Sequence, residues 1–121
     1  KRVLDVGQCN PDHGSICRLI QSNFDAHVVR AHLPNDALAQ LHADKFDLVL
    51  VNRKLDQDYS DGLDIIKTMK ADPDLAKVPV MLVTNYADHQ AIAVAAGAEL
   101  GFGKLEYNKP ETIEKLGRFL S

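Results

Sequence analysis

FDLVLVNRKLDQDYSDG, residues 46–62, is the stretch of sequence that decides the fold. Within it, an apolar run at 48–51 ends at Asn52 and continues into a polar loop, and a helix signal follows at Asp61. A short apolar run between turn signals is typical of a strand that is buried on both faces of a parallel sheet. The carboxyl ends of such strands border the crevice in which open α/β sheets bind ligands. We therefore expect Asn52 to lie at the functional edge of an α/β sheet.

The same pattern, a strand followed by a helix, is predicted five times along the chain. Strands are expected at 3–7, 27–31, 48–52, 79–84 and 99–103. The first helix is expected to begin at Asn10, which caps it, the second near residue 34, and the third at Ser60 or Asp61. The last two helices are expected to span 88–96 and 110–120. Gly97 is expected to end the fourth helix. Alternating strands and helices with right-handed crossovers give a parallel sheet covered on both faces.

Length and composition indicate one globular domain that spans residues 1–121. The 121 residues are 45% hydrophobic and 26% charged, and the net charge is -3. This charge gives no electrostatic reason to expect binding to nucleic acid or to a membrane surface. No apolar run approaches the roughly 20 residues that span a bilayer, and no signal peptide is present. We therefore expect a cytoplasmic protein. Its start at Lys1, without a methionine, is compatible with a domain of a longer protein.

Four strand ends are expected to meet around one crevice. These ends carry Gly7, Gln8 and Cys9; Asn52, Arg53 and Lys54; Thr84 and Asn85; and Lys104. The side chains in this set include amides, cations, one hydroxyl group and one thiol, but no carboxylate. The predicted crevice therefore differs from an acidic metal site.

The whole chain resembles the receiver domains of bacterial two-component response regulators. The resemblance is strongest in DGLDIIKTMK at 61–70, PVMLVT at 79–84 and AIAVAAGAELGFGK at 91–104. It implies a flavodoxin-like (βα)5 fold of three layers, with a five-stranded parallel sheet in the order 2-1-3-4-5. It also implies that Thr84 and Lys104 match the residues that contact phosphate in this family.

Three positions depart from the pattern of the family. Receivers have a magnesium-binding acidic pair where Gly7 and Gln8 stand, and a phosphate-accepting aspartate where Asn52 stands. An amide is a poor nucleophile, and magnesium prefers oxygen ligands that include carboxylates. We therefore predict no phosphorylation, no bound metal or cofactor, and no enzymatic activity. On this interpretation, acidic residues introduced together at positions 7, 8 and 52 restore metal binding.

The cations of the predicted crevice have two interpretations. Without carboxylates nearby, Lys104, Arg53 and Lys54 lack an obvious anionic partner, which favours a bound anion if their side chains point inward. Alternatively, Arg53 and Lys54 are solvated loop charges, as such residues usually are. The resemblance implies that six of the strand-end residues form the crevice equivalent to the phosphorylation site of receivers: Gly7, Gln8, Asn52, Lys54, Thr84 and Lys104.

The segment before the last helix departs from receivers in two further ways. The fifth strand of receivers usually carries an aromatic residue at the place of Gly101, and here Phe102 follows it instead. Receivers also have a cis proline after the lysine, whereas Leu105 follows Lys104. A non-proline cis bond costs about 2.5–4 kcal/mol, so we expect a trans peptide.

Three residues outside the crevice are candidates for other roles. Cys17 is expected to be a wholly or partly buried helix residue. Cys9 precedes a helix, where the helix dipole can lower the pKa of a thiol, and it is the candidate for a reactive cysteine. Asp5 lies inside a predicted buried strand, so we expect a salt bridge or hydrogen bond, with a functional role as the alternative.

A different class of protein is the alternative. RVLDVG at 2–7 and KFDLVLVN at 45–52 resemble motifs of S-adenosylmethionine-dependent methyltransferases. Those enzymes place further glycines after the first motif, where this chain has Gln8, Cys9 and Asn10, and their seven-stranded core needs a longer chain.

The favoured hypothesis is a receiver-like domain of a phosphorelay pathway that acts by protein–protein interaction. The resemblance implies that its last two helices and fifth strand bind the partner, which is a signalling protein or a second copy of the chain.

Overall fold

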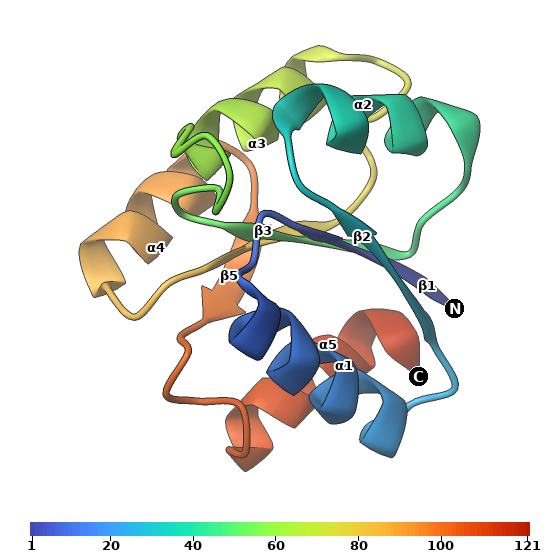
Figure 1. Cartoon of the computed structure of the whole chain (residues 1–121), viewed down its shortest axis with the longest axis vertical. Helices are drawn as coiled ribbons and strands as arrows, with labels where there is room; N and C mark the ends of the chain where they lie inside the picture. The colour runs from blue at the N-terminus through green and yellow to red at the C-terminus, as the bar shows by residue number, and fades with distance from the viewer.

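The computed structural model describes all residues, 1–121, and contains five strands that alternate with five helices (Figure 1). The strands are β1 (Arg2–Val6), β2 (His27–Ala31), β3 (Leu48–Asn52), β4 (Val80–Val83) and β5 (Glu99–Phe102). The helices are α1 (Asn10–Asn23), α2 (Pro34–Ala43), α3 (Gly62–Ala71), α4 (Ala87–Ala95) and α5 (Pro110–Leu120). All ten predicted elements are therefore present.

The strands form one parallel sheet in the order β2-β1-β3-β4-β5, which confirms the predicted flavodoxin-like topology. In the centre of the sheet, Leu4 of β1 lies opposite Val49 of β3, and Val49 lies opposite Val80 of β4. The chain reverses its direction of travel across the sheet between β1 and β3. The carboxyl ends of these two strands therefore border a topological switch point, where doubly wound sheets bind ligands.

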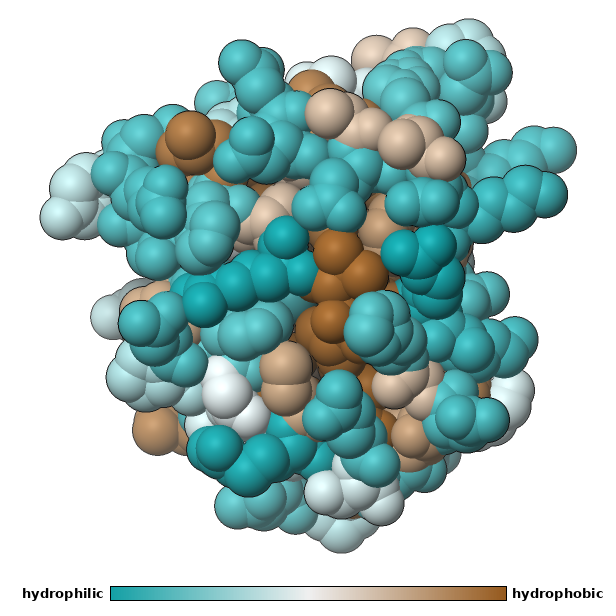
Figure 2. Space-filling model, turned by 45° about the vertical axis from the view of Figure 1, so that its right-hand side comes forward, coloured by the Kyte–Doolittle hydropathy of each residue, from teal (hydrophilic) through white to brown (hydrophobic).

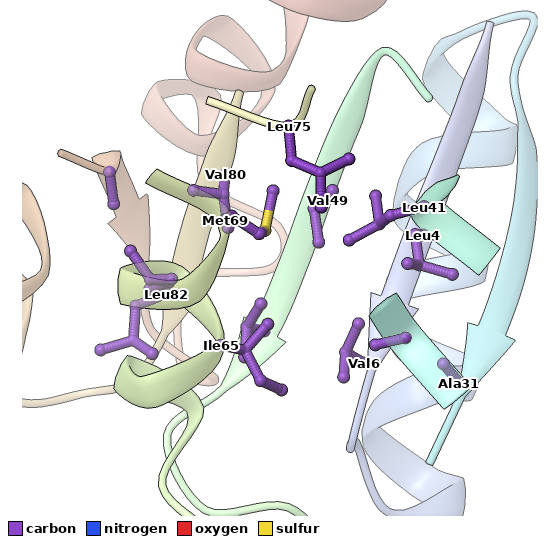
Figure 3. Packing of buried hydrophobic residues seen from close by; sticks show 14 of the residues in the cluster. Leu4, Val6, Ala31, Leu41, Val49, Ile65, Met69, Leu75, Val80 and Leu82 are labelled. Carbon is purple, nitrogen blue, oxygen red and sulfur yellow. The ribbon is translucent and has the colours of Figure 1, made fainter. Parts of the chain in front are cut away.

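Helices cover both faces of the sheet and make three layers. In Figure 1, α2, α3 and α4 lie on one face, and α1 and α5 lie on the other. The larger apolar cluster joins the sheet to α2, α3 and α4, and Figure 3 shows Leu4, Val49 and Met69 packed within it. A second cluster joins the sheet to α1 and α5. Because both faces are covered, all five residues of β3 are buried, as its apolar run predicts.

Most helix boundaries follow the predicted signals, but the cap of α1 does not. Asp61 caps α3, because its Oδ1 accepts a hydrogen bond of 3.0 Å from the Leu63 amide. Gly97 has φ +109° and follows the end of α4, as predicted. The prediction that Asn10 caps α1 is wrong. Cys9 has the extended backbone of a cap, and its carbonyl accepts from the His13 amide, so Asn10 is already helical.

The surface shown in Figure 2 is mainly hydrophilic, with one narrow hydrophobic strip between polar side chains. None of the five helices is long and apolar enough to cross a lipid bilayer.

Candidate functional site

Four of the six predicted crevice residues line one cavity at the carboxyl ends of the central strands. The cavity has a volume of about 480 Å³. Asn52, Lys54, Thr84 and Lys104 line it, together with Val83, Arg53, Asn85, Tyr86 and His89. Gly7 does not line the cavity, but its carbonyl accepts a hydrogen bond from Asn52, which does. The side chain of Gln8 is fully buried outside the cavity. The structure therefore brings four of the six residues together at the edge of the sheet where the sequence analysis expects a crevice.

Asn52 joins the two loops that border the crevice. It is the last residue of β3 and is 8% exposed. Its Nδ2 atom donates to the Gly7 carbonyl at 3.1 Å and to the Lys54 carbonyl at 2.7 Å. Two carbonyl oxygens thus converge on an amide nitrogen, which supplies both hydrogens that they accept. An ionised carboxylate has no hydrogen to donate and cannot replace this amide with the same partners.

Gly7 is fixed as a glycine by its backbone and by its neighbour. Its φ is +75°, in the left-handed region that favours glycine. A Cβ at this position would collide with the side chain of Leu55, which is fully buried. The expectation that a carboxylate could be restored at position 7 is therefore wrong for this backbone, because Leu55 fills the space that a side chain would need.

Lys104 has an anionic partner, contrary to the expectation from the sequence. Its Nζ lies 3.0 Å from Oδ2 of Asp12, in the first turn of α1. Asp12 also accepts hydrogen bonds from the Tyr107 hydroxyl at 3.1 Å and the Cys9 thiol at 3.2 Å. Burial by itself raises the pKa of the Asp12 carboxyl, but hydrogen bonds from Lys104 and Cys9 outweigh it and hold that pKa below its ordinary value.

The remaining crevice side chains are less constrained. Thr84 is buried, and its hydroxyl accepts a hydrogen bond of 3.4 Å from the Tyr86 amide. Lys54 is exposed and Arg53 is half-buried, and neither forms an ion pair. The exposure of Lys54 fits the solvated-charge interpretation, whereas Arg53 contributes a partly shielded cation to the cavity wall.

Asp5 and Gln8 form a separate buried polar cluster against α1. Asp5 is fully buried, and its Oδ2 lies 2.6 Å from Nδ1 of His13, which confirms the expected salt bridge or hydrogen bond. Burial raises the pKa of Asp5 to about 6, although His13 and Arg30 oppose the shift. The Gln8 amide lies beside this carboxylate, but neither its nitrogen nor its oxygen has hydrogen-bond geometry to a partner.

The segment around β5 has the two departures that the sequence indicates. The chain contains no cis peptide bond, so Lys104-Leu105 is trans as predicted. Gly101 packs against the Leu82 carbonyl, and its amide donates to Oε1 of Gln90 at 2.9 Å. Phe102 is buried, in the apolar cluster beneath α1 and α5. A side chain at position 101 therefore has no room in this packing.

Sequence reasoning missed the pairing of Asp12 with Lys104 and the position of Leu55, because it considered mainly the strand ends and the charges beside them. Asp12 carried one detectable signal, its place as the acidic residue in the first turn of α1. Such a residue lies beside the carboxyl end of the preceding strand. Leu55 carried a weaker signal, as an apolar residue inside an otherwise polar loop.

Comparisons with known proteins agree with this fold. A family model described as the response regulator receiver domain matches residues 11–116. The signal receiver domain of the DNA-binding response regulator merR from Colwellia psychrerythraea is 24% identical, with a TM-score of 0.83 and coverage of 97% of this chain and 95% of that chain. Chemotaxis protein CheY4 of Vibrio cholerae is 20% identical, with a TM-score of 0.77 and 98% of both chains covered.

A third similar structure is the response regulator TrrA of Thermotoga maritima, solved in complex with Mg(2+)-BeF. It is 20% identical, with a TM-score of 0.78, and 99% of each chain is covered. These likenesses concern the fold. Together with the family match, they give no support to the methyltransferase alternative.

Proposed function

The chain belongs to the response regulator receiver domain family of two-component signalling, and we propose that it works by binding a protein partner without being phosphorylated. The observation that carries this proposal is the place of Asn52. It ends β3 at the crevice, where the resemblance implies a phosphate-accepting aspartate, and its amide is hydrogen-bonded to two carbonyl groups.

The chemistry of phosphorylation supports the proposal. A phosphoryl group is transferred in this family to a carboxylate oxygen, which attacks phosphorus as a nucleophile. The Asn52 nitrogen shares its lone pair with the amide carbonyl, and both of its hydrogens are already donated. Lys104 is paired with Asp12, so its charge is already balanced within the protein.

The residues present do not fit the magnesium ion that the family implies. Magnesium needs near-octahedral oxygen ligation, usually with one or two carboxylates. Gly7 has no side chain, Gln8 is buried outside the cavity, and Asn52 turns its NH₂ group toward the two nearest carbonyls. No group of three or more histidine, cysteine or acidic side chains is placed to hold a metal ion. A bound metal therefore has no part in the proposed function.

Exposed apolar side chains on α4 and β5 support a role in protein binding. Ile92 and Val94 of α4 are 50% and 44% exposed, and Leu100 of β5 is 54% exposed. α4 and β5 pack against each other, and Tyr86 and Leu105 add exposed apolar area at their ends. We define these five residues as the α4–β5 surface. Protein interfaces are typically apolar at their centre with a polar rim.

The absence of phosphorylation is tested by incubation with acetyl phosphate and magnesium, followed by intact-mass measurement. We expect no added phosphoryl group, because the residue at the end of β3 is Asn52, which has an amide where phosphorylation needs a carboxylate. A receiver with its aspartate is the positive control. A stoichiometric phosphoryl adduct that Asn52→Ala abolishes would contradict the proposal.

The binding surface is tested with single charged substitutions. Leu100→Lys places a charge on the α4–β5 surface, whereas Tyr59→Lys changes a residue that is 76% exposed in the loop after β3. Partners are compared by affinity capture with mass spectrometry, and self-association by sedimentation velocity. We expect Leu100→Lys to lose the complex or dimer and Tyr59→Lys to retain it. The reverse pattern would place the interface elsewhere.

A further inference from the structure

Three side chains form a hydrogen-bonded chain beneath α1, apart from the crevice. Asp5 of β1 lies 2.6 Å from Nδ1 of His13, and Nε2 of His13 lies 3.4 Å from Sγ of Cys17. His13 and Cys17 are four residues apart on α1, so their side chains project from the same helix face. Asp5 points at this face from the sheet because it alternates with the apolar residues Leu4 and Val6.

The order of the three groups sets the role of each. An ionised Asp5 can only accept, so Nδ1 of a neutral His13 carries the hydrogen and Nε2 keeps its lone pair. That lone pair is directed at the Cys17 thiol. A nucleophile, a base and a group that orients the base then stand in sequence, which is the arrangement that activates cysteine and serine nucleophiles on unrelated folds. We propose that Cys17 is a reactive thiol, with His13 as its base, and that its substrate class is small hydroperoxides.

A fourth residue places positive charge at the site. Arg30 lies opposite Asp5 in the register of β1 and β2, and its guanidinium donates to the Gln8 carbonyl at 2.9 Å. Its charge favours the thiolate of Cys17, as does that of Arg18. Burial and the Asp5 carboxylate nevertheless raise the pKa of the Cys17 thiol. Cys17 is therefore a thiol at neutral pH, and it needs a base that removes its proton during the reaction.

Access to Cys17 selects small reagents. Cys17 and His13 are half-buried rather than enclosed. Cavities of about 910, 480, 340 and 140 Å³ do not include Cys17 in their lining, so none of these four places an organic substrate beside the sulfur. Hydrogen peroxide is small and uncharged, and it can reach a partly exposed sulfur without such a cavity.

The reaction is a two-electron oxidation of sulfur. The Cys17 thiol proton passes to Nε2 of His13 while the sulfur attacks one peroxide oxygen. The S–O bond forms, the O–O bond breaks, and the departing hydroxide takes the proton from His13 and leaves as water. Sulfur is oxidised to the sulfenic acid and the peroxide is reduced, so no further oxidant is needed.

Cys9 provides an internal comparison within the same chain. It is also half-buried, but the one hydrogen bond of its thiol is to Asp12, and no histidine ring is hydrogen-bonded to that thiol. The sequence favours Cys9 as the reactive thiol because of its place before α1. The side-chain geometry favours Cys17 instead, because only Cys17 has a base.

The test treats the whole chain with hydrogen peroxide and dimedone, and peptide mass spectrometry measures the labelling rate at each cysteine. General-base catalysis typically contributes at least about 100-fold, so even a partial effect should make Cys17 label about tenfold faster than Cys9. His13→Gln should remove this difference and leave the Cys9 rate unchanged. In urea, where the chain of hydrogen bonds is absent, the two rates should become equal.

Equal labelling of the two cysteines in the folded protein would overturn the proposal, as would a Cys17 rate that His13→Gln leaves unchanged. The comparison of folded and urea-unfolded wild-type protein needs no variant, so a His13→Gln protein that fails to fold does not prevent a decision.

Discussion

Asn52→Asp is the substitution that most directly tests how the crevice is held together. It replaces one NH₂ group with an oxygen, and Asn52 Nδ2 donates to two carbonyl oxygens at 3.1 and 2.7 Å. Loss of two hydrogen bonds costs about 1 kcal/mol each, and a buried, unpaired carboxylate adds about 1–3 kcal/mol. We therefore expect the free energy of unfolding to fall by about 3–5 kcal/mol at pH 7, a large share of the roughly 5–15 kcal/mol typical of a domain.

The measurement is urea unfolding without divalent ions, with Asn52→Ala as the control. The alanine variant loses the same two hydrogen bonds but introduces no charge, so its loss should be about 2 kcal/mol. Burial beside two carbonyls raises the pKa of the introduced carboxyl in the folded protein. The extra loss should therefore be largest above that folded pKa and should disappear as pH falls toward about 4, where the unfolded carboxyl also takes up a proton. An aspartate variant as stable as wild type at pH 7 would refute this reasoning.

Three further predictions concern the neighbouring residues. Gly7→Ala should destabilise the fold by about 1–3 kcal/mol, because position 7 has a positive φ and a Cβ there would collide with Leu55. Gly14→Ala should instead stabilise by about 0.5–1 kcal/mol, because position 14 is helical and a Cβ there would meet only the end of the flexible Arg18 side chain, at 3.4 Å; thermal unfolding compares the two variants. Because the pKa of Asp5 is raised to about 6, its contribution to stability is complete below about pH 4 and is lost by about pH 6, on the order of 3 kcal/mol. Asp5→Asn should remove this dependence from pH-resolved urea curves, and an unchanged dependence would assign it to another group. The lowered pKa of Asp12 makes its contribution present above about pH 4 and lost at lower pH, and Asp12→Asn should flatten the acid limb of the same curves.

The fold could be predicted because its signals are local. The apolar run of β3, the proline residues near the starts of three helices and Gly97 after α4 each report on a few neighbouring residues. A parallel sheet also constrains its own topology, since right-handed crossovers leave few arrangements for five repeats. The crevice position followed from the same constraint, because parallel strands end at one edge.

The contacts that define the site could not be predicted in the same way. Asp12 and Lys104 lie 92 positions apart in sequence, and only the course of the segment between β5 and α5 past the start of α1 brings them together. Leu55 occupies the space beside Gly7 because of the course of the loop after β3. The chain of Asp5, His13 and Cys17 had a partial signal, the spacing of four between the last two. Its third member comes from a strand, and helix periodicity says nothing about which strand residue faces the helix.

The proposed absence of phosphorylation has its cause at several positions of the crevice and not at Asn52 alone. Leu55 fills the space beside Gly7, the Asn52 amide satisfies the carbonyls of Gly7 and Lys54, and Asp12 neutralises Lys104. Each of these groups has a partner within the protein, so reversing one change removes a contact without supplying the others. Metal and nucleophile act as a unit whose members are not additive. Carboxylates at positions 7, 8 and 52 together would also fail on this backbone, because position 7 has no room for a side chain and position 8 points away from the cavity. Restoring the chemistry therefore requires a different loop after β3, one that withdraws Leu55 from Gly7.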